Sequence, residues 1–161
     1  MIFYESVFKA FNKAKIDYVV FGGVAAVLYG VHRTTMDLDV MIKMTPKNID
    51  RLFGALHRLG YRPKLPISIE EFKDARRRKI WVKEKNMLVF AFIHKNDPLK
   101  IVDIAIYDFI KYSVIKKERM KLGDFYIPVI SLAQLKKLKK KANRQQDLVD
   151  LDDLRRLLVF S

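Results

Sequence analysis

Two aspartates separated by one residue carry the clearest chemical signal in the sequence. Asp37 and Asp39 lie in DLDVMIKM (37–44), an apolar segment typical of a strand. Because strand side chains alternate between two faces, both carboxylates point to the same side. Like charges held together on an apolar strand repel each other, and a divalent cation between them would remove that penalty. Mg²⁺ prefers carboxylate oxygens together with substrate phosphates, so this spacing predicts a site for metal-assisted phosphate chemistry.

A third aspartate is predicted on another apolar strand. Asp103 lies in KIVDIAIY (100–107), where isoleucine and valine surround it. A carboxylate in such surroundings is costly unless it pairs with a cation or binds a metal. For Asp103 alone, a buried ion pair with a Lys or Arg side chain is an equal alternative. Alongside Asp37 and Asp39, it is predicted to complete a metal-binding set.

A glycine pair follows the buried strand predicted at 16–21. Gly22 and Gly23 come directly after IDYVVF, and a short helix ending at Gly30 is expected next. Glycine lets the backbone approach a ligand closely, and the amides of a helix start can face a phosphate. A simple tight turn is the alternative, and for a lone Gly-Gly it is the more common one.

The turn ahead of Asp37 offers further phosphate donors. Arg33 carries a guanidinium, and Thr34 and Thr35 add hydroxyl groups. Taken alone, an arginine in a turn is usually solvated, so these residues gain weight only from the carboxylates that follow them.

The elements that must position these residues alternate between strands and helices, which indicates an α/β (α+β) fold in a single domain. The N-caps Thr45, Ser68 and Ser131 each open a predicted helix, and residues 61–66, with two prolines, are predicted to be a loop. The basic run 76–79 has no predicted element and is most often a solvated face. Helices are predicted at 2–14, 24–30, 45–59, 68–75, 109–118 and 131–142. A final helix is predicted to turn Leu148, Leu151, Leu154 and Leu158 inward. Strands are predicted at 16–21, 37–44, 87–94 and 100–107, with a strand or hairpin around Gly123 that ends at Pro128.

Composition limits the classes of partner. The 161 residues carry a formal net charge of +14, which favours a polyanionic partner such as nucleic acid or a nucleotide, although a lysine-rich solvated surface is the alternative. Cysteine is absent, which excludes disulfides and thiolate metal sites. The chain shows no signal-peptide pattern and no apolar run long enough to span a membrane, so a cytoplasmic protein is expected.

In this order, the motifs resemble those of the DNA polymerase beta-like nucleotidyltransferase superfamily. The matching elements are Phe21-Gly22-Gly23, Asp37-Leu38-Asp39 and Asp103 on a separate strand. The C-terminal stretch ISLAQLKKLKKKANRQQDLVDL looks like the closing segment of small standalone nucleotidyltransferases related to AbiEii-type toxins. The corresponding residues there are Lys139, Arg144, Asp147 and Asp150, and Gln146 stands where that pattern usually has lysine.

The resemblance implies a mixed β-sheet flanked by helices, with a catalytic core over about 1–108 and a C-terminal helical segment over about 129–161 that completes the site. It implies that Gly22 and Gly23 hold an NTP triphosphate, with ATP among the candidates. Asp37 and Asp39 would bind two Mg²⁺ ions, and Asp103 would share one of them and help deprotonate the attacking hydroxyl. The remaining nucleotide-binding candidates are Arg33, Thr35, Lys139, Arg144 and Asp147. Asp147 and Asp150 would orient the basic residues or touch the nucleotide, the alternative being surface charges paired along one helix.

The implied reaction transfers an NMP from an NTP to an acceptor hydroxyl and releases pyrophosphate. Excess positive charge favours RNA, such as a tRNA end, as the acceptor over a small molecule, and protein side chains are another class of acceptor. A toxin role would imply an antitoxin partner. The alternative from a different class is a non-catalytic nucleotide- or nucleic-acid-binding module on the same fold.

Overall fold

The protein is described here by a computed structural model that covers residues 4–160, with side chains described as far as residue 157. Ile2 and Phe3 of the predicted first helix, and the inward-facing role predicted for Leu158, lie outside the described residues. The helices are α1 (Glu5–Lys13), α2 (Gly22–Leu28), α3 (Pro46–Arg58), α4 (Ile69–Lys73), α5 (Ala75–Lys85), α6 (Leu132–Ala142) and α7 (Gln145–Phe160), with a 3₁₀ turn η1 (Tyr112–Val114). The strands are β1 (Tyr18–Phe21), β2 (Asp37–Ile42), β3 (Tyr61–Pro63), β4 (Val89–His94), β5 (Asp97–Ala105), β6 (Lys117–Leu122) and β7 (Phe125–Ile130).

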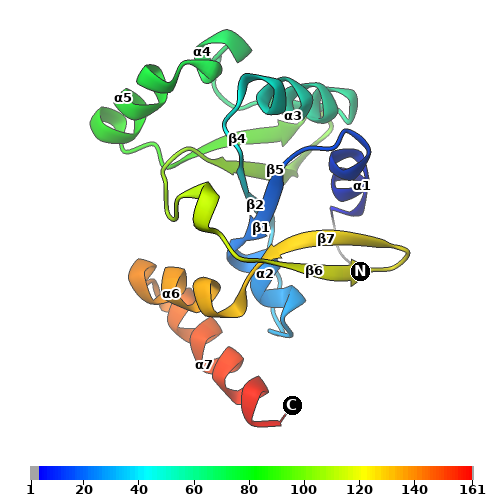
Figure 1. The fold of residues 1–161 in the computed structure, drawn as a ribbon, viewed down its shortest axis with the longest axis vertical. Helices are drawn as coiled ribbons and strands as arrows, with labels where there is room; N and C mark the ends of the chain where they lie inside the picture. Colours follow the sequence, from blue (N-terminus) through cyan, green and yellow to red (C-terminus); the bar gives the residue numbers. More distant parts are fainter. Residues whose placement is uncertain (1–3, 161) are drawn as a thin grey trace.

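The described strands form one mixed seven-stranded sheet in the order β3-β4-β5-β2-β1-β7-β6. The pairs β2–β5 and β1–β7 are parallel, whereas the others are antiparallel. Strand β2 therefore lies at the centre of the sheet, between β1 and β5 (Figure 1). The predicted mixed sheet flanked by helices is confirmed.

Two groups of helices lie at opposite ends of the molecule (Figure 1). At one end, α3 contacts α1, α4 and β3, and at the other, α7 packs on α6, which also contacts α2. Rings of Phe53, Phe72, Phe90 and Phe92 pack together between α3, α4 and β4, with ring centroids 4.9 to 6.2 Å apart. Burial of each such ring contributes about 1.5–3 kcal/mol, which anchors α3 and α4 to the sheet.

The predicted N-caps form as expected. Thr45 accepts a hydrogen bond from the Asn48 amide ahead of α3, and Ser68 and Glu71 form a reciprocal capping box at α4. Ser131 accepts from the Gln134 amide and so opens α6, the helix that carries Lys139. Asn143, in the left-handed conformation, ends α6 and turns the chain into α7.

Three local predictions were wrong. Residues 61–63 form strand β3 rather than a loop, because β3 is at the edge of the sheet, where Pro63 at its end has no ladder bond to donate. Leu148, predicted to turn inward from the final helix, is 51% exposed, whereas Asp147 and Asp150 of the same helix are buried. The basic run 76–79, for which no element was predicted, lies inside helix α5, which Asp74 caps by accepting from the amides of residues 76 and 77. The helix predicted over 109–118 is only the single turn η1.

Candidate functional site

The three predicted carboxylates lie on one face of two neighbouring central strands. In the parallel pairing of β2 with β5, Asp39 is opposite Asp103, and Asp37 is two residues before Asp39 on the same face. All three side chains line one cavity of about 540 Å³. Within residues 4–160, however, no three acidic or histidine side chains are already spaced to hold a metal ion, so the metal-binding role stays a prediction.

The electrostatics of these carboxylates suit a cation. Burial, followed by the charges of Asp103 and Asp37, raises the pKa of Asp39 to about 7. Burial and the charge of Asp37 raise the pKa of Asp103 to about 6, with Lys64 acting in the opposite direction. Asp39 and Asp103 therefore resist ionisation beside their neighbours. Carboxylate oxygens are hard donors that suit Mg²⁺, and the charge of the ion would offset the repulsion.

The glycine pair is required by close approach within the protein itself. Gly22 has a φ of +67°, and a Cβ atom there would lie 2.2 Å from Oδ2 of Asp39. A Cβ atom at Gly23 would lie 2.6 Å from Oγ1 of Thr35 and 2.7 Å from Nη2 of Arg33. The pair thus lets the start of α2 sit directly against β2 and the turn before it. This packing role was not foreseen from the sequence.

A second, smaller cavity of about 370 Å³ adjoins the first, and the two share Asp37, Asp39 and Arg144. The smaller cavity is lined mainly by polar groups, among them Arg33, Thr35 and Gln146. The larger cavity has an apolar wall made of Phe21, Leu88, Val89, Phe109, Leu135 and Leu138. The carboxylates therefore lie at the junction of a polar and an apolar space.

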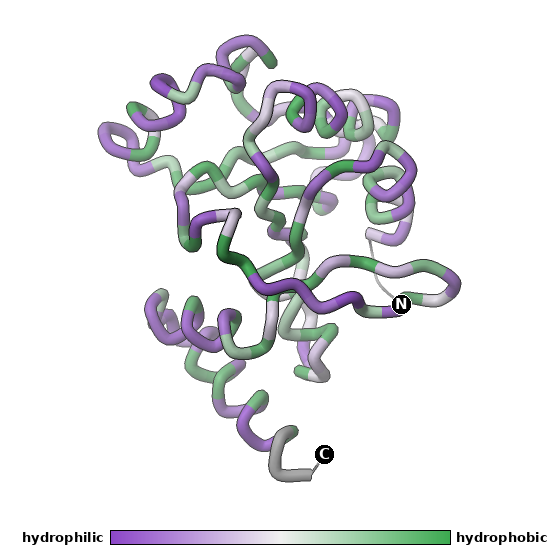
Figure 2. Tube along the Cα trace, in the orientation of Figure 1, coloured by the Kyte–Doolittle hydropathy of each residue, from purple (hydrophilic) through white to green (hydrophobic). Residues whose placement is uncertain are grey.

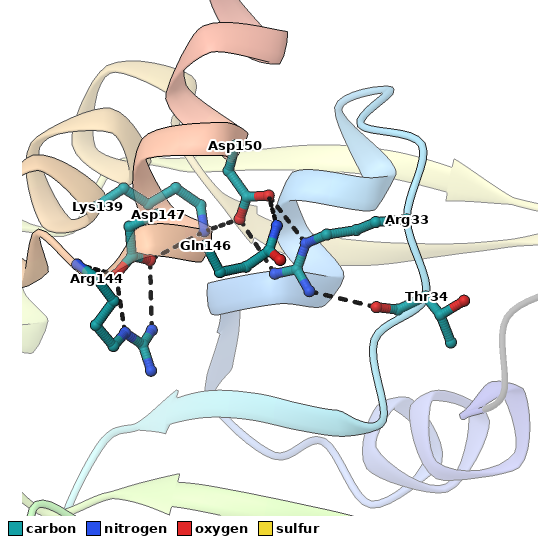
Figure 3. A network of polar contacts seen from close by, with 7 residues as sticks. All are labelled: Arg33, Thr34, Lys139, Arg144, Gln146, Asp147 and Asp150. Carbon is teal, nitrogen blue, oxygen red and sulfur yellow. Dashed lines mark hydrogen bonds and ion pairs between the residues drawn. The ribbon is translucent and has the colours of Figure 1, made fainter.

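The predicted basic residues converge on two buried aspartates of α7 (Figure 3). Asp150 is 0% exposed and lies 2.7 Å from Nζ of Lys139. It also accepts from Nη2 of Arg33 at 3.1 Å and from Nε2 of Gln146 at 2.9 Å. Nε of Arg33 lies 2.9 Å from the same carboxylate without hydrogen-bond alignment. Gln146 thus takes a structural part in the position where the related pattern has lysine.

Asp147 holds the second half of this network. It accepts from Nε of Arg144 at 2.8 Å and lies 3.7 Å from Nζ of Lys139. The Arg144 side chain is 77% exposed, and the hydrogen bond to Asp147 raises the pKa of its guanidinium. Because Asp147 and Asp150 are both buried, the alternative of charges on the helix surface is wrong for these two residues.

Two residues near the site were missed from the sequence. Lys64, beyond β3, places a positive charge near Asp103, but it falls in a segment predicted to be a loop. The hydroxyl of Tyr4 hydrogen bonds to the backbone of Met36, just before Asp37, and of Ile101, two residues before Asp103. No periodicity or spacing in the sequence links residue 4 to either strand, so the two hydrogen bonds of Tyr4 could not be predicted.

This architecture, with its carboxylates at the centre of a mixed sheet, is the nucleotidyltransferase fold. One solved structure with this fold is the lincosamide antibiotic adenylyltransferase LnuA bound to lincomycin, with a TM-score of 0.58, 16% identity, and coverage of 94% of this chain and 93% of that chain. Another is an antigenic nucleotidyltransferase-like protein from Paracoccidioides brasiliensis, with a TM-score of 0.60, 13% identity, and coverage of 97% of this chain and 74% of that chain. At these identities the likeness establishes the fold alone. No protein-family model matches the chain, and no curated protein matches it by sequence.

Of the helices in residues 4–160, none combines the length and apolar character needed to cross a bilayer.

Proposed function

We propose that this protein is a metal-dependent nucleotidyltransferase that moves an NMP from an NTP to an acceptor hydroxyl. The observation that carries the proposal is the in-register placement of Asp39 beside Asp103, with Asp37 on the same face, where the two cavities meet. Carboxylates with raised pKa values at such a junction are typical of a site that handles phosphate with a divalent cation.

Each part of the site has a place in this reaction. Asp37, Asp39 and Asp103 would hold Mg²⁺, expected as two ions, which when bound would neutralise phosphate charge and favour the attacking oxygen. Asp103 would also help to deprotonate the acceptor hydroxyl. In-line attack forms a bond to the α-phosphorus and breaks its bond to the bridging oxygen, which leaves with pyrophosphate.

The two cavities suggest how the NTP lies. Arg144, exposed and shared by both cavities, is the cation best placed to contact the phosphates, with Gly23, Arg33 and Thr35 in the polar cavity around it. The apolar wall of the larger cavity would take the nucleoside, because a base has two apolar faces. Lys139 and Asp147 line the same cavity and would stabilise this arrangement.

The charge distribution favours an RNA acceptor, such as a tRNA end. Figure 2 shows hydrophilic residues gathered along α5 and α6. The larger cavity is lined by Leu88 and Val89, which follow the end of α5, and by residues of α6. We propose that the exposed cations of α5 and α6 form an RNA-binding surface beside this cavity. Phosphate contacts of this kind attract RNA without reading its sequence. An RNA substrate and NTPs would suit a cytoplasmic protein, and tRNA modification would suit a toxin with an antitoxin partner.

A non-catalytic nucleotide-binding module is the second candidate. Two observations favour it: no three acidic side chains within residues 4–160 are preset for a metal, and Arg33 and Lys139 are both engaged by Asp150. Thermal stabilisation by NTPs separates the two candidates. The enzyme should require Mg²⁺ and an intact Asp39 for that stabilisation, whereas a metal-independent module should not.

The test of the proposal is label transfer from each α-phosphate-labelled NTP with Mg²⁺ to total RNA or total protein. The Asp39→Asn variant should lose transfer, and Asp152→Asn, which changes an exposed carboxylate of α7, should retain it. Label that survives protease and is lost on nuclease digestion identifies RNA as the acceptor. Equal transfer by the wild type and Asp39→Asn would refute the assignment of the site.

A charge-reversal pair tests the RNA surface on α5. The double variant Lys79→Glu/Lys83→Glu should weaken RNA binding and its salt dependence, because exposed α5 cations would no longer displace counterions. Lys13→Glu/Lys47→Glu changes the net charge equally on α1 and α3 and is the matched control. Equal losses of RNA affinity in both variants, measured by filter binding, would show that only net charge matters.

A further inference from the structure

The hydroxyl of Tyr4 connects the two strands that carry the site carboxylates. It accepts a hydrogen bond from the Ile101 amide of β5 at 3.1 Å and donates one to the carbonyl of Met36. Met36 immediately precedes Asp37, and Ile101 is opposite Asp37 in the β2–β5 register. One side chain therefore bridges both strands at the level of Asp37, where β2 begins.

Tyr4 is held rigidly enough to serve as such a bridge. Its side chain is 1% exposed, it occupies the N-cap position of α1, and its carbonyl accepts from the Phe8 amide at 3.0 Å. Val7, Phe8 and Phe11 fix α1 in the core. The position of the hydroxyl is thus determined by a helix that supplies none of the proposed site residues.

The start of β2 requires a contact that holds it beside β5. Residues 30–36 ahead of it form no helix or strand, so Asp37 is at the free end of the strand. Asp37 also repels Asp39 and Asp103, since its charge contributes to the raised pKa of each. Repulsion at the end of a strand favours fraying away from its partner.

We propose that Tyr4 is a positioning residue that fixes Asp37 beside Asp39 and Asp103 by joining Met36 to Ile101; the inference rests on the proposed metal-dependent function. The bridge acts through the backbone of the two strands rather than on a reacting group. Burial raises the pKa of the Tyr4 phenol against the opposing effect of the Ile101 amide, and the three carboxylates raise it further. The hydroxyl therefore keeps its proton and remains a donor to Met36 throughout the physiological range.

A matched pair of variants isolates the bridge. Tyr4→Phe removes the hydroxyl and retains the buried ring. Tyr18→Phe does the same at a tyrosine that is 2% exposed and whose hydroxyl donates to Oδ1 of Asn12 at 2.9 Å. Tyr18 is opposite Ile42, at the other end of β2 from Asp37, so its loss tests general stability without touching the site.

Two readouts are needed, amide hydrogen exchange by NMR and Mn²⁺ binding to the nucleotide-free protein by EPR. In Tyr4→Phe, the Ile101 amide should exchange faster, because its acceptor is gone. The Kd for Mn²⁺ should rise about fivefold, the change expected from the loss of one hydrogen bond that orders the site. In Tyr18→Phe, both the exchange of Ile101 and the Kd for Mn²⁺ should match the wild type.

The outcomes separate the two hypotheses. If Tyr4→Phe binds Mn²⁺ as tightly as the wild type does, the positioning role is refuted and the proposed function still stands. A wild type that binds no Mn²⁺ either alone or with an NTP would refute the proposed function, and with it any role of Tyr4 toward a metal. An equal loss of affinity in Tyr4→Phe and Tyr18→Phe would attribute the effect to general destabilisation and would also refute the positioning role.

Discussion

Replacement of Asp150 by asparagine should destabilise the protein far more than a change of one carboxylate usually does. Asp150 is 0% exposed and accepts from Lys139, Arg33 and Gln146. The asparagine side chain would keep the shape and remove the charge. Lys139, whose side chain is only 5% exposed, would then have Asp147 at 3.7 Å as its remaining anionic contact among the described residues.

The magnitude follows from the cost of an uncompensated buried charge. Removal of one partner of a buried ion pair costs about 3–5 kcal/mol. Against a typical stability of about 5–15 kcal/mol, that is a large share of the total. At about 2–4 °C per kcal/mol for a chain of this size, the Tm should fall by roughly 6–20 °C.

Urea unfolding followed by circular dichroism measures this loss, and helix α7 supplies a matched control. Asp152 pairs with Arg156 at 2.8 Å, but the two side chains are 58% and 72% exposed. Asp152→Asn should therefore cost less than about 0.5 kcal/mol. If Asp150→Asn cost no more than this control, Asp150 would not be the anion that compensates Lys139 and Arg33.

The same carboxylate sets a direction for pH dependence. Burial alone would raise the pKa of Asp150, but hydrogen bonds from Lys139, Gln146 and Arg33 outweigh it and hold the pKa below its ordinary value. A lowered pKa in the folded state means that the stabilisation is complete above the unfolded value of about 3.9. It is lost as the pH falls from there through the folded value. Asp150→Asn should therefore flatten the acid side of the stability profile.

Two other substitutions test the geometry of the carboxylates. Gly22→Ala should abolish label transfer and lower the Tm more than Gly123→Ala does. Both residues have positive φ, but only at Gly22 would the new Cβ meet Asp39. Equal effects on the Tm would show that backbone strain alone matters. Asp39→Asn should raise the Tm of the metal-free protein at pH 8 and leave it unchanged near pH 4. A pKa raised to about 7 means that folding stability is lost as the pH rises from about 4 through 7, so the opposite trend would contradict the burial of that charge. In the wild type, the affinity for Mn²⁺ should fall up to about tenfold per pH unit below 7, as protons compete for the same carboxylate.

Local signals account for the parts of the fold and site that could be predicted. The alternation of side chains placed Asp37 and Asp39 on one face, and the N-caps Thr45 and Ser131 were recognised from their own few residues. The prediction for residues 61–63 was wrong for a different reason. The prolines in 61–66 suggested a loop, and only the edge position of β3 permits Pro63 in a strand.

The features of the site that could not be predicted depend on contacts between residues far apart in the sequence. Arg33 meets Asp150 across 117 positions of the sequence, and Tyr4 meets Ile101 across 97. The resemblance left open whether Asp147 and Asp150 face inward or outward, because their burial depends on how α7 packs on α6. Register between β2 and β5, which puts Asp39 opposite Asp103, is likewise a property of the assembled sheet.

The network on α7 also has a consequence for the order in which the chain is made. Synthesis runs from the N-terminus, so Arg33 and Lys139 leave the ribosome before Asp147 and Asp150. Until α7 folds back onto α6, Arg33 at the polar cavity and Lys139 at the larger cavity have no buried anion from α7 to pair with. The site therefore stays incomplete until α7 has folded, and a chain truncated before residue 145 should be inactive even when the sheet that carries all three carboxylates is complete.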